Sequence, residues 1–323
     1  MKRLWIILLL CASLAGCSKE RSGGAVGNGD PGQQEETGGT PINPGAMVKG
    51  PAFSDEVDDT PQVSLSNIKV LRVDGITPNF TLLTAPAISA TITAGSTAMP
   101  FSPRQYFKAN HDDAHFMAYY PAGTFVAGNP VKVNYTIDGS QDIMATAPST
   151  AVWQSGGTNI AFQFEHKLAL LELNVIAADQ GTATAYGALQ HASVSAPNEL
   201  TLSISAAGSS SLARSAGSSA MADMVFTGAQ MSVSPEKKSY YVMVDPASVI
   251  TKIKLTFANR TATLLDLYET GTNTLGLSLE AGKKTVITAM VYADEIQCVV
   301  SIEPWKVDAT NPGGEIEVGG NVP

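Results

Sequence analysis

Short stretches in which apolar and polar side chains alternate recur along the chain from residue 68 onward. In the clearest one, apolar side chains occupy every second position of residues 131–137, and the turn pair Asp138-Gly139 follows. Residues 68–73 and 88–92 show the same period of two. This period is typical of half-buried β-strands, which turn one face to a core and the other to water.

The segment 160–177 is apolar over most of its length, but the parity of its apolar positions changes partway along. Large side chains fall on one parity in residues 162–170 and on the other in residues 171–175. Residues 167–173 also fit a helical period of 3.6, yet the alternation on both sides favours a strand. We therefore expect a strand with a kink or bulge near Leu170-Leu171.

Seven further strands are expected nearer the C-terminus, at residues 200–204, 240–244, 253–257, 264–268, 275–279, 286–292 and 296–302. Residues 206–220 are mostly Gly, Ser and Ala and are expected to form a loose loop. No amphipathic helix longer than three turns and no βαβ alternation is evident. Many short strands separated by Gly, Pro and Asn predict an all-β fold of Greek-key β-sandwiches.

The first sixty residues have a different pattern. Residues 18–61 contain almost no large apolar side chains, so they cannot bury enough surface to offset the entropy of ordering. We expect a flexible tether there, and a chain of 323 residues is long enough for two domains after it. The expected division is a signal peptide at 1–16, the tether at 17–61, an N-terminal β-sandwich at 62–158 and a C-terminal β-sandwich at 159–323.

The N-terminus has the three-part layout of a secretory signal. Lys2 and Arg3 precede an apolar run at residues 4–12, and Leu14-Ala15-Gly16-Cys17 ends it before a cysteine. The run is too short for a stable transmembrane helix. Its end resembles the bacterial lipobox, which implies cleavage before Cys17 and a lipid on the Cys17 thiol. An ordinary secreted protein with a chance cysteine at the cut is the alternative. Each buried methylene contributes about 0.8 kcal/mol, so two or three chains of palmitate length would anchor the protein stably.

Composition and cysteine count narrow the classes of partner. Charged residues make up only 15% of the chain, the net charge is −9, and no basic cluster is present, which excludes nucleic acid as an expected partner. The three cysteines stand at positions 11, 17 and 298. Cys11 leaves with the signal and Cys17 is expected to be acylated, so no disulfide is expected. Cys298 lies in an expected strand and is interpreted as a small buried side chain.

Candidate catalytic and metal-binding patterns are weak. His111 and His115 have the four-residue spacing of two ligands on a helix face, but the glutamate of a zinc-protease motif is absent and a solvated turn is favoured. Residues 276–285 have a superficial likeness to a phosphate loop, yet the glycine spacing is one residue too long; a turn at Ala281-Gly282 is expected. No Ser-His-acid set is evident. We therefore expect no enzyme activity, no metal and no cofactor.

Five short motifs follow one another in the second and third thirds of the chain. They are Phe116-Met-Ala-Tyr-Tyr-Pro121, Asp142-Ile-Met144, Phe162-x-Phe164-x-His166-x-Leu168-Ala169, Gly282-Lys283 and Ile302-Glu-Pro-Trp305. With the lipobox-like segment, they resemble the fimbrillin family, the lipoprotein-derived subunits of type V pili in Bacteroidota. The resemblance spans roughly residues 67–307. It implies two transthyretin-like β-sandwiches in tandem, the second opening at residues 162–175.

The resemblance also implies assembly by strand exchange. In the family, an arginine- or lysine-specific protease removes the first strand, and a neighbour's strand then satisfies the open groove. The first expected strand here is residues 68–73, so Arg72 at its end is the first candidate for cleavage and Lys49 is the second. Alternatively, Arg72 is an outward-facing strand residue and the chain stays lipid-anchored, as basal anchor subunits do; both alternatives stay open here. Glu315-Ile316-Glu317-Val318 is the candidate donor strand.

The expected function is therefore a fimbrial structural or anchor subunit that supports cell adhesion through assembly. Its expected location is the cell outer membrane, through its lipid, and/or a fimbrium. The expected partners are other fimbrial subunits or copies of itself, joined by strand exchange. The alternative is a monomeric surface lipoprotein that binds glycans through exposed aromatic side chains. Electrophoresis of unboiled cell envelopes separates the two, because only an assembling subunit gives a heat-sensitive ladder.

Overall fold

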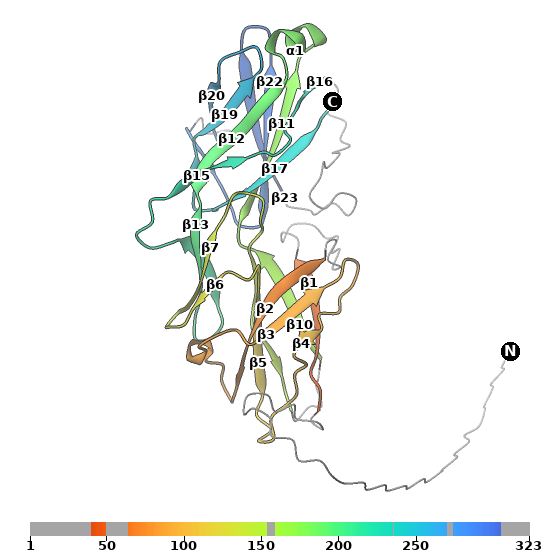
Figure 1. Ribbon diagram of the computed structural model, residues 1–323, viewed down its shortest axis with the longest axis vertical. Coiled ribbons are helices and arrows are strands. Elements are labelled where there is room, and N and C mark those ends of the chain that lie inside the picture. Colours follow the sequence, from red (N-terminus) through yellow and green to blue (C-terminus); the bar gives the residue numbers. More distant parts are fainter. Residues whose placement is uncertain (1–39, 50–63, 154–158, 235, 270–273, 305–323) are drawn as a thin grey trace, which may run out of the picture. The chain divides into compact units, whose positions relative to one another are not determined.

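The structure is a computed structural model, and almost all of the part it describes is β-structure (Figure 1). The described residues are 40–49, 64–153, 159–234, 236–269 and 274–304. Within these ranges, helical structure is confined to the 3-10 turn η1 (Phe80–Leu82) and the helix α1 (Gln180–Tyr186). α1 begins where the Asp179 side chain accepts a hydrogen bond from the Thr182 amide (2.7 Å). The predicted all-β fold class is confirmed.

The largest sheet has eight strands in the order β1-β10-β8-β5-β2-β3-β4, with β9 also paired to β5. β1 runs parallel to β10, and the other pairs are antiparallel. β10 is alternately exposed and buried from end to end, as its sequence predicts. The bounds are β1 (Asn43–Lys49), β2 (Leu65–Asp74), β3 (Ile88–Ile92), β4 (Phe101–Ser102), β5 (Ala114–Tyr120), β8 (Met144–Thr146), β9 (Ser149–Ala151) and β10 (Asn159–His166).

A four-stranded sheet in the order β14-β13-β7-β6 shares a core with one face of β5. Met117 and Tyr119 of β5 belong to the same buried cluster as Val133 of β7 and Leu202 of β13. The opposite face of β5 contributes to a second cluster, so β5 is buried on both sides. The bounds are β6 (Thr124–Val126), β7 (Val131–Thr136), β13 (Glu199–Ile204) and β14 (Ser210–Arg214).

The remaining strands form two larger sheets and one small one. β11 lies in the middle of the first, between β22 on one edge and β16 and β17 on the other, and β23 follows β22. The second has the order β15-β12-β19-β20, and β18 pairs with β21. The bounds are β11 (Ala169–Ala177), β12 (Leu189–Pro197), β15 (Met221–Val225), β16 (Met231–Val233), β17 (Ser239–Val244), β18 (Val249–Ile250), β19 (Lys252–Phe257), β20 (Thr263–Asp266), β21 (Leu277–Ser278), β22 (Lys283–Val291) and β23 (Ile296–Pro304).

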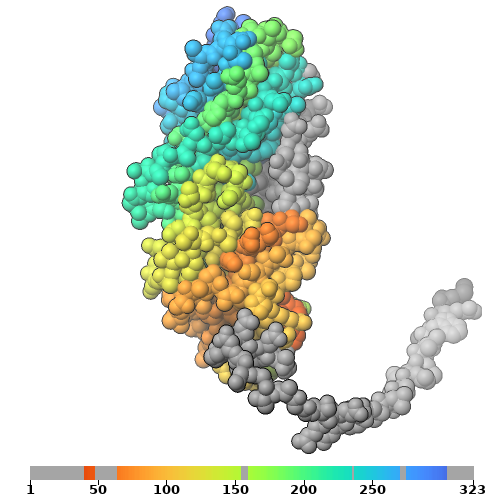
Figure 2. Space-filling view, viewed as in Figure 1, coloured from red at the N-terminus to blue at the C-terminus, as the bar shows by residue number. Residues whose placement is uncertain are grey.

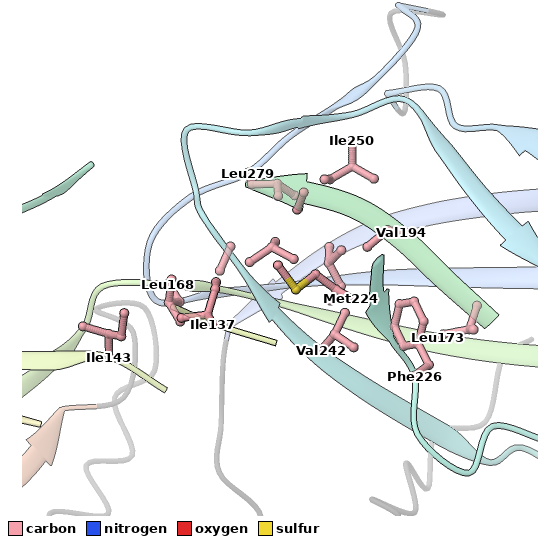
Figure 3. Close-up of a cluster of buried hydrophobic side chains, with 14 of the residues drawn as sticks. Ile137, Ile143, Leu168, Leu173, Val194, Met224, Phe226, Val242, Ile250 and Leu279 are labelled. Atoms are coloured by element: carbon pink, nitrogen blue, oxygen red, sulfur yellow. The ribbon is translucent and has the colours of Figure 1, made fainter. Parts of the chain in front are cut away.

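These two larger sheets bury their facing side chains in one apolar cluster. Figure 3 shows Leu173 of β11 and Val242 of β17 meeting Val194 of β12 and Met224 of β15. All four side chains are at most 1% exposed. This core is therefore supplied by the inward-facing side chains of the strands, as the alternation of apolar and polar positions predicts.

The structure differs from the expected tether at residues 43–49, which form β1. Ala46 in this strand and Ile42 directly before it are buried, at 1% and 2% exposure. Pro44 and Gly45 interrupt the segment, so its alternation is weak and its composition is that of a linker. The strand forms because two other segments supply partners for its backbone.

The structure also differs from the expected loop at residues 206–220. Residues 210–214 form β14, which pairs with β13 along its whole length. This stretch, blue-green in Figure 2, lies at the surface, and none of the β14 side chains is buried. An edge strand held by backbone hydrogen bonds leaves little pattern in the sequence, which is why it was not predicted.

Residues 160–177 are extended rather than helical, so the choice of strand is confirmed. The expected kink near Leu170-Leu171 was wrong. The chain instead breaks at Lys167-Leu168 and passes from β10 in one sheet to β11 in another. Because β11 is buried on both faces, Leu170 is also covered, and the change of parity appears later in the sequence than the break itself.

Two of the hydrogen-bonded sheets contain strands from both sides of the predicted domain boundary after residue 158. β10 starts at Asn159 and pairs with β1 and β8, while β13 pairs with β7. The tandem transthyretin-like Greek-key arrangement and its two ranges, 62–158 and 159–323, stay a prediction.

Candidate functional site

β1 is the first strand of the described chain, and one of its edges pairs with β10. The two strands run parallel, from Asn43 opposite Asn159 to Lys49 opposite Glu165. Figure 1 shows them side by side. Antiparallel hairpins are closed by short turns, whereas a parallel pair such as this is joined through a long intervening chain. β1 is therefore held in the sheet by its contacts and not by a tight connection to β10.

The other edge of β1 is hydrogen-bonded to residues 97–107, which flank β4. The Ala46 amide donates to the Thr97 carbonyl (2.7 Å), and the Pro44 carbonyl accepts from the Met99 amide (3.3 Å). Further along, the Ile42 amide donates to the Gln105 carbonyl (3.0 Å). β1 thus lies between β10 and residues 97–107, and it satisfies the backbone groups of both.

The buried Ala46 of β1 belongs to an apolar cluster that contains several aromatic rings. Ala46 is paired with Phe162, which is fully buried. The Phe162 ring lies 6.0 Å from that of Phe101, which is stacked 5.4 Å from Phe116. We call the space that β1 occupies the β1 groove; its edges are β10 and residues 97–107, and its floor is these three rings. Without a strand in it, the groove would expose apolar surface and unpaired backbone groups together.

Lys49, the second candidate for cleavage, is the last residue of β1. Arg72, the first candidate, is not at the end of the first strand, because the first strand is β1 and β2 continues to Asp74. The expectation that residues 68–73 are the first strand was therefore wrong. A cut after Lys49 separates β1 from the rest of the sheet, whereas a cut after Arg72 falls inside β2.

The Arg72 side chain is engaged within the sheet and is only 13% exposed. Its guanidinium donates to Asp74 Oδ1 from Nε (3.0 Å) and Nη2 (2.7 Å), and to Gln105 Oε1 from Nη1 (2.8 Å). The guanidinium carbon also lies 5.5 Å from the centre of the Phe116 ring. Since the Gln105 carbonyl also accepts from the amide of Ile42, directly before β1, Arg72 supports one edge of the β1 groove.

The histidines have structural partners. His115 in β5 contacts Thr150 Oγ1 through Nδ1 and the Gly75 carbonyl through Nε2, both at 2.8 Å. His111, its partner in the candidate metal pattern, instead stacks on Trp153 with ring centres 4.1 Å apart. Nδ1 of His166 lies 2.6 Å from Asp142 Oδ2, at the end of β10. Across the described residues, no group of three or more His, Cys, Asp or Glu side chains is placed to hold a metal ion.

Two further residues from the sequence analysis are placed by the structure. The Cys298 side chain, expected to be buried, is only half-buried where it packs against the core. Its burial raises its pKa to about 11, so the thiol is protonated at neutral pH and is a poor nucleophile. The expected turn at Ala281-Gly282 is present and leads into β22, with Gly282 at φ +71°. Lys283 binds Glu280 (2.6 Å), which agrees with a turn and not with a phosphate loop.

A buried ion pair on β11 and β22 was not predicted. Lys284 Nζ lies 2.8 Å from Glu172 Oε2, and Glu172 is only 1% exposed. Asn174 and Ser239 donate to Glu172 Oε1 at 3.1 and 2.8 Å. Burial alone would lower the pKa of Lys284, but hydrogen bonding and charge from Glu172 and Glu303 outweigh it and raise that pKa. The one available signal was Glu172 in a strand that is apolar apart from it and Asn174.

Three predicted features lie outside the described residues. They are the lipidation site Cys17, the candidate donor strand Glu315-Ile316-Glu317-Val318, and Trp305 of the last motif. In the described part of the chain, no helix combines the length and apolar character needed to cross a membrane.

Comparison with known proteins agrees with this fold. Residues 69–305 match the family model described as Fimbrillin-like. A candidate cell adhesion protein of known structure from Bacteroides uniformis superimposes with a TM-score of 0.58 at 17% identity, covering 84% of this chain and 100% of that chain. A second, from Bacteroides ovatus, gives 0.53 at 14% identity and covers 84% and 99%. At such low identities, these superpositions show a shared fold and no more.

The comparison with curated proteins finds no match. The family match covers most of the chain, and it agrees with the order of motifs found in the sequence. Proteins of this kind are structural and not enzymatic. The chain belongs to the fimbrillin-like family, and its role is that of a fimbrial protein of the cell surface.

Proposed function

We propose that this protein is a fimbrial subunit that joins its neighbours by donor-strand exchange in the β1 groove. One observation carries the proposal: β1 is bonded along both edges, covers an aromatic floor and ends at a lysine. Loss of such a strand leaves a groove in which backbone hydrogen bonds provide affinity and side-chain positions provide specificity. The chain needs no catalytic group for this role.

The proposed processing site is Lys49 and not Arg72. Cleavage after Lys49 frees β1 as a unit, and the rest of the eight-stranded sheet keeps its pairing. Cleavage after Arg72 would divide β2, whose residues 69–74 are paired with β5. It would also remove the guanidinium that binds Gln105 beside the β1 groove.

The proposed location before cleavage is the cell outer membrane, through a lipid on Cys17. A chain that keeps β1 stays attached to this lipid and serves as an anchor subunit. A chain cut after Lys49 loses the lipid together with β1 and enters the fimbrium. Both roles follow from the same groove, and the fraction of cleaved chains decides between them.

The test is electrophoresis of unboiled cell envelopes from cells that carry the original chain, Lys49→Gln or Arg72→Gln, with N-terminal sequencing of the surface protein. The original chain should give a heat-sensitive ladder, and both it and Arg72→Gln should give a new N-terminus at Gly50. Lys49→Gln should give a single band that begins at lipidated Cys17. A ladder that survives Lys49→Gln, or an N-terminus at Val73, would contradict the proposal.

A further inference from the structure

β15 is shorter than β12, the strand beside it, and this difference leaves one end of β12 open. β15 pairs with residues 193–197 of β12, and directly after it the Phe226 amide donates to the Ala192 carbonyl (3.0 Å). The chain then turns away, since the Ala229 amide donates to the Phe226 carbonyl (3.1 Å), and it continues into β16 in the sheet of β11. Within the described residues, no strand pairs with residues 189–191 on the side of β15.

β12 has a bulge at the same place. Consecutive pairs between β12 and β19 are Leu189 with Phe257 and His191 with Thr256. Gln190, between them, has no residue opposite it in β19, and its side chain is exposed. A bulge redirects the side chain of the extra residue, and bulges are frequent beside binding sites.

The open end of β12 and the turn after β15 form a surface cleft of about 290 Å³. Its polar side chains are those of Gln190, His191 and Gln230, and Val225 adds an apolar one. The Phe226 ring lies beneath the cleft, because it is 1% exposed and belongs to the core shown in Figure 3. None of the described residues that line the cleft is Asp, Glu, Lys or Arg. We call it the β12 cleft; it is lined by residues 189–192, 225, 226 and 228–230.

The two glutamine side chains of the β12 cleft are free to bind a ligand. In the part of the chain that the structure describes, no hydrogen bond involves the side-chain amide of Gln190 or Gln230. Each amide offers a hydrogen-bond donor and an acceptor side by side. Nε2 of His191 lies 3.0 Å from Ser193 Oγ, a contact that holds the ring and leaves Nδ1 for a ligand.

These groups match a neutral sugar. The hydroxyls of a sugar ring each donate and accept, so one amide can bind two neighbouring hydroxyls. A carboxylate or phosphate would find no cation in the lining, and a basic ligand would find no carboxylate. The volume lies at the lower limit of about 300 Å³ for small-molecule sites, which suits one sugar unit. An added peptide strand, in contrast, would have only residues 189–191 to pair with.

We infer that the β12 cleft binds one neutral sugar unit of a surface glycan, with Gln190 and Gln230 binding its hydroxyl groups and His191 a third polar contact. The inference goes beyond the proposed function and does not rest on strand exchange, because no lining residue belongs to β1, β10 or residues 97–107. A site with so few contacts binds its sugar weakly, at about millimolar concentration. In a fimbrium the site would be repeated, and many weak contacts to one glycan-covered surface add up to tight attachment.

Saturation-transfer NMR on the purified full-length protein tests the ligand class. The probes are the methyl glycosides of glucose, galactose, mannose, fucose and N-acetylglucosamine, measured one at a time. At least one should receive saturation, whereas N-acetylneuraminic acid, which carries a carboxylate, and a capped valine tripeptide should receive none. Saturation of none of the neutral sugars would overturn the inference, and so would saturation of the acidic sugar or the tripeptide alone.

Two variants test the place of binding. Gln190→Ala and Gln230→Ala each remove an amide that makes up to two hydrogen bonds, so each should weaken binding of the saturated sugar about tenfold in an NMR titration. The matched control is Gln297→Ala, which removes an exposed glutamine of β23 and should leave binding unchanged. Thermal unfolding of each variant serves as the folding control.

The outcomes separate this inference from the proposed function. Equal binding by the original chain, Gln190→Ala and Gln230→Ala would place the sugar elsewhere and overturn the assignment of the β12 cleft. These titrations use unassembled protein, so their failure would not affect strand exchange. A missing ladder in cell envelopes would contradict strand exchange and leave the sugar titrations unchanged.

Discussion

Trypsin should distinguish the two candidate processing sites in the purified, full-length protein. To enter the active site of a protease, the backbone around a scissile bond must separate from the neighbouring strands of its sheet. At Arg72 this means releasing residues 69–74 from β5 and exposing Val70 and Leu71, which are 0% and 1% exposed. Burial of each such side chain contributes about 1.5–3 kcal/mol, and two of them about 3–6 kcal/mol.

An opening cost of this size lowers the cleavable population about a hundredfold to ten-thousandfold, since each 1.4 kcal/mol is a factor of ten. Cleavage of a transiently opened strand follows that population when opening and closing are fast. At Lys49 only the last residues of one strand must separate from β10. Lys49 should therefore be cut at least a hundred times faster than Arg72.

The assay is a time course of limited trypsin digestion in which mass spectrometry quantifies peptides that begin at Gly50 and at Val73. In Lys49→Gln the first should vanish, and in Arg72→Gln the digestion at Gly50 should be unchanged. In urea, where the sheet is unfolded, both sites should be cut at similar rates. Comparable rates at the two sites in the folded protein would refute the argument from burial.

Three further predictions concern stability and reactivity. Lys284→Met should lower the free energy of unfolding by about 3–5 kcal/mol in urea titrations, because Glu172 keeps a buried charge without its cation; adding Glu172→Leu should restore most of it. Phe162→Ala should cost about 3–5 kcal/mol in the same assay, whereas Gln163→Ala on the exposed face should change stability by less than about 0.5 kcal/mol. Cys298, with a pKa of about 11, should react slowly with iodoacetamide at pH 7.5 and faster as pH rises toward that value; fast labelling of the folded protein at neutral pH would contradict its burial.

The parts of the fold that sequence predicted well are those in which side-chain burial alternates. β7 and β10 are buried at every second residue; β7 was expected within one residue of both bounds, and β10 within one residue of its start. β11 was harder to predict, because both of its faces are buried and the positions of its apolar residues do not show which face a side chain points to. The break at Lys167-Leu168 depends on which sheets the two strands join, and this is a property of the whole fold.

The candidate site was predicted less well, for a related reason. β1 depends on backbone hydrogen bonds to β10 and to residues 97–107, and such bonds do not select side chains. Pro44 and Gly45 gave the segment the composition of a linker. The two candidates for cleavage, Arg72 and Lys49, stay predictions, and their order was based on residues 68–73 as the first strand. Arg72 looked terminal only while β2 was taken as the first strand.

Pro44 also bears on why β1 can be replaced. Even-numbered residues of β1 bond to residues 97–107, as the Ala46 amide does to the Thr97 carbonyl, but Pro44 has no amide hydrogen to donate. Any replacing strand with a residue other than proline at this position has one more amide available. A hydrogen bond contributes about 0.5–1.5 kcal/mol net, enough to favour the incoming strand about twofold to tenfold. Pro44→Val should therefore shorten the ladder in unboiled envelopes by strengthening β1, whereas Asn43→Val at the outward position should not; a ladder unchanged by Pro44→Val would show that this amide has no partner.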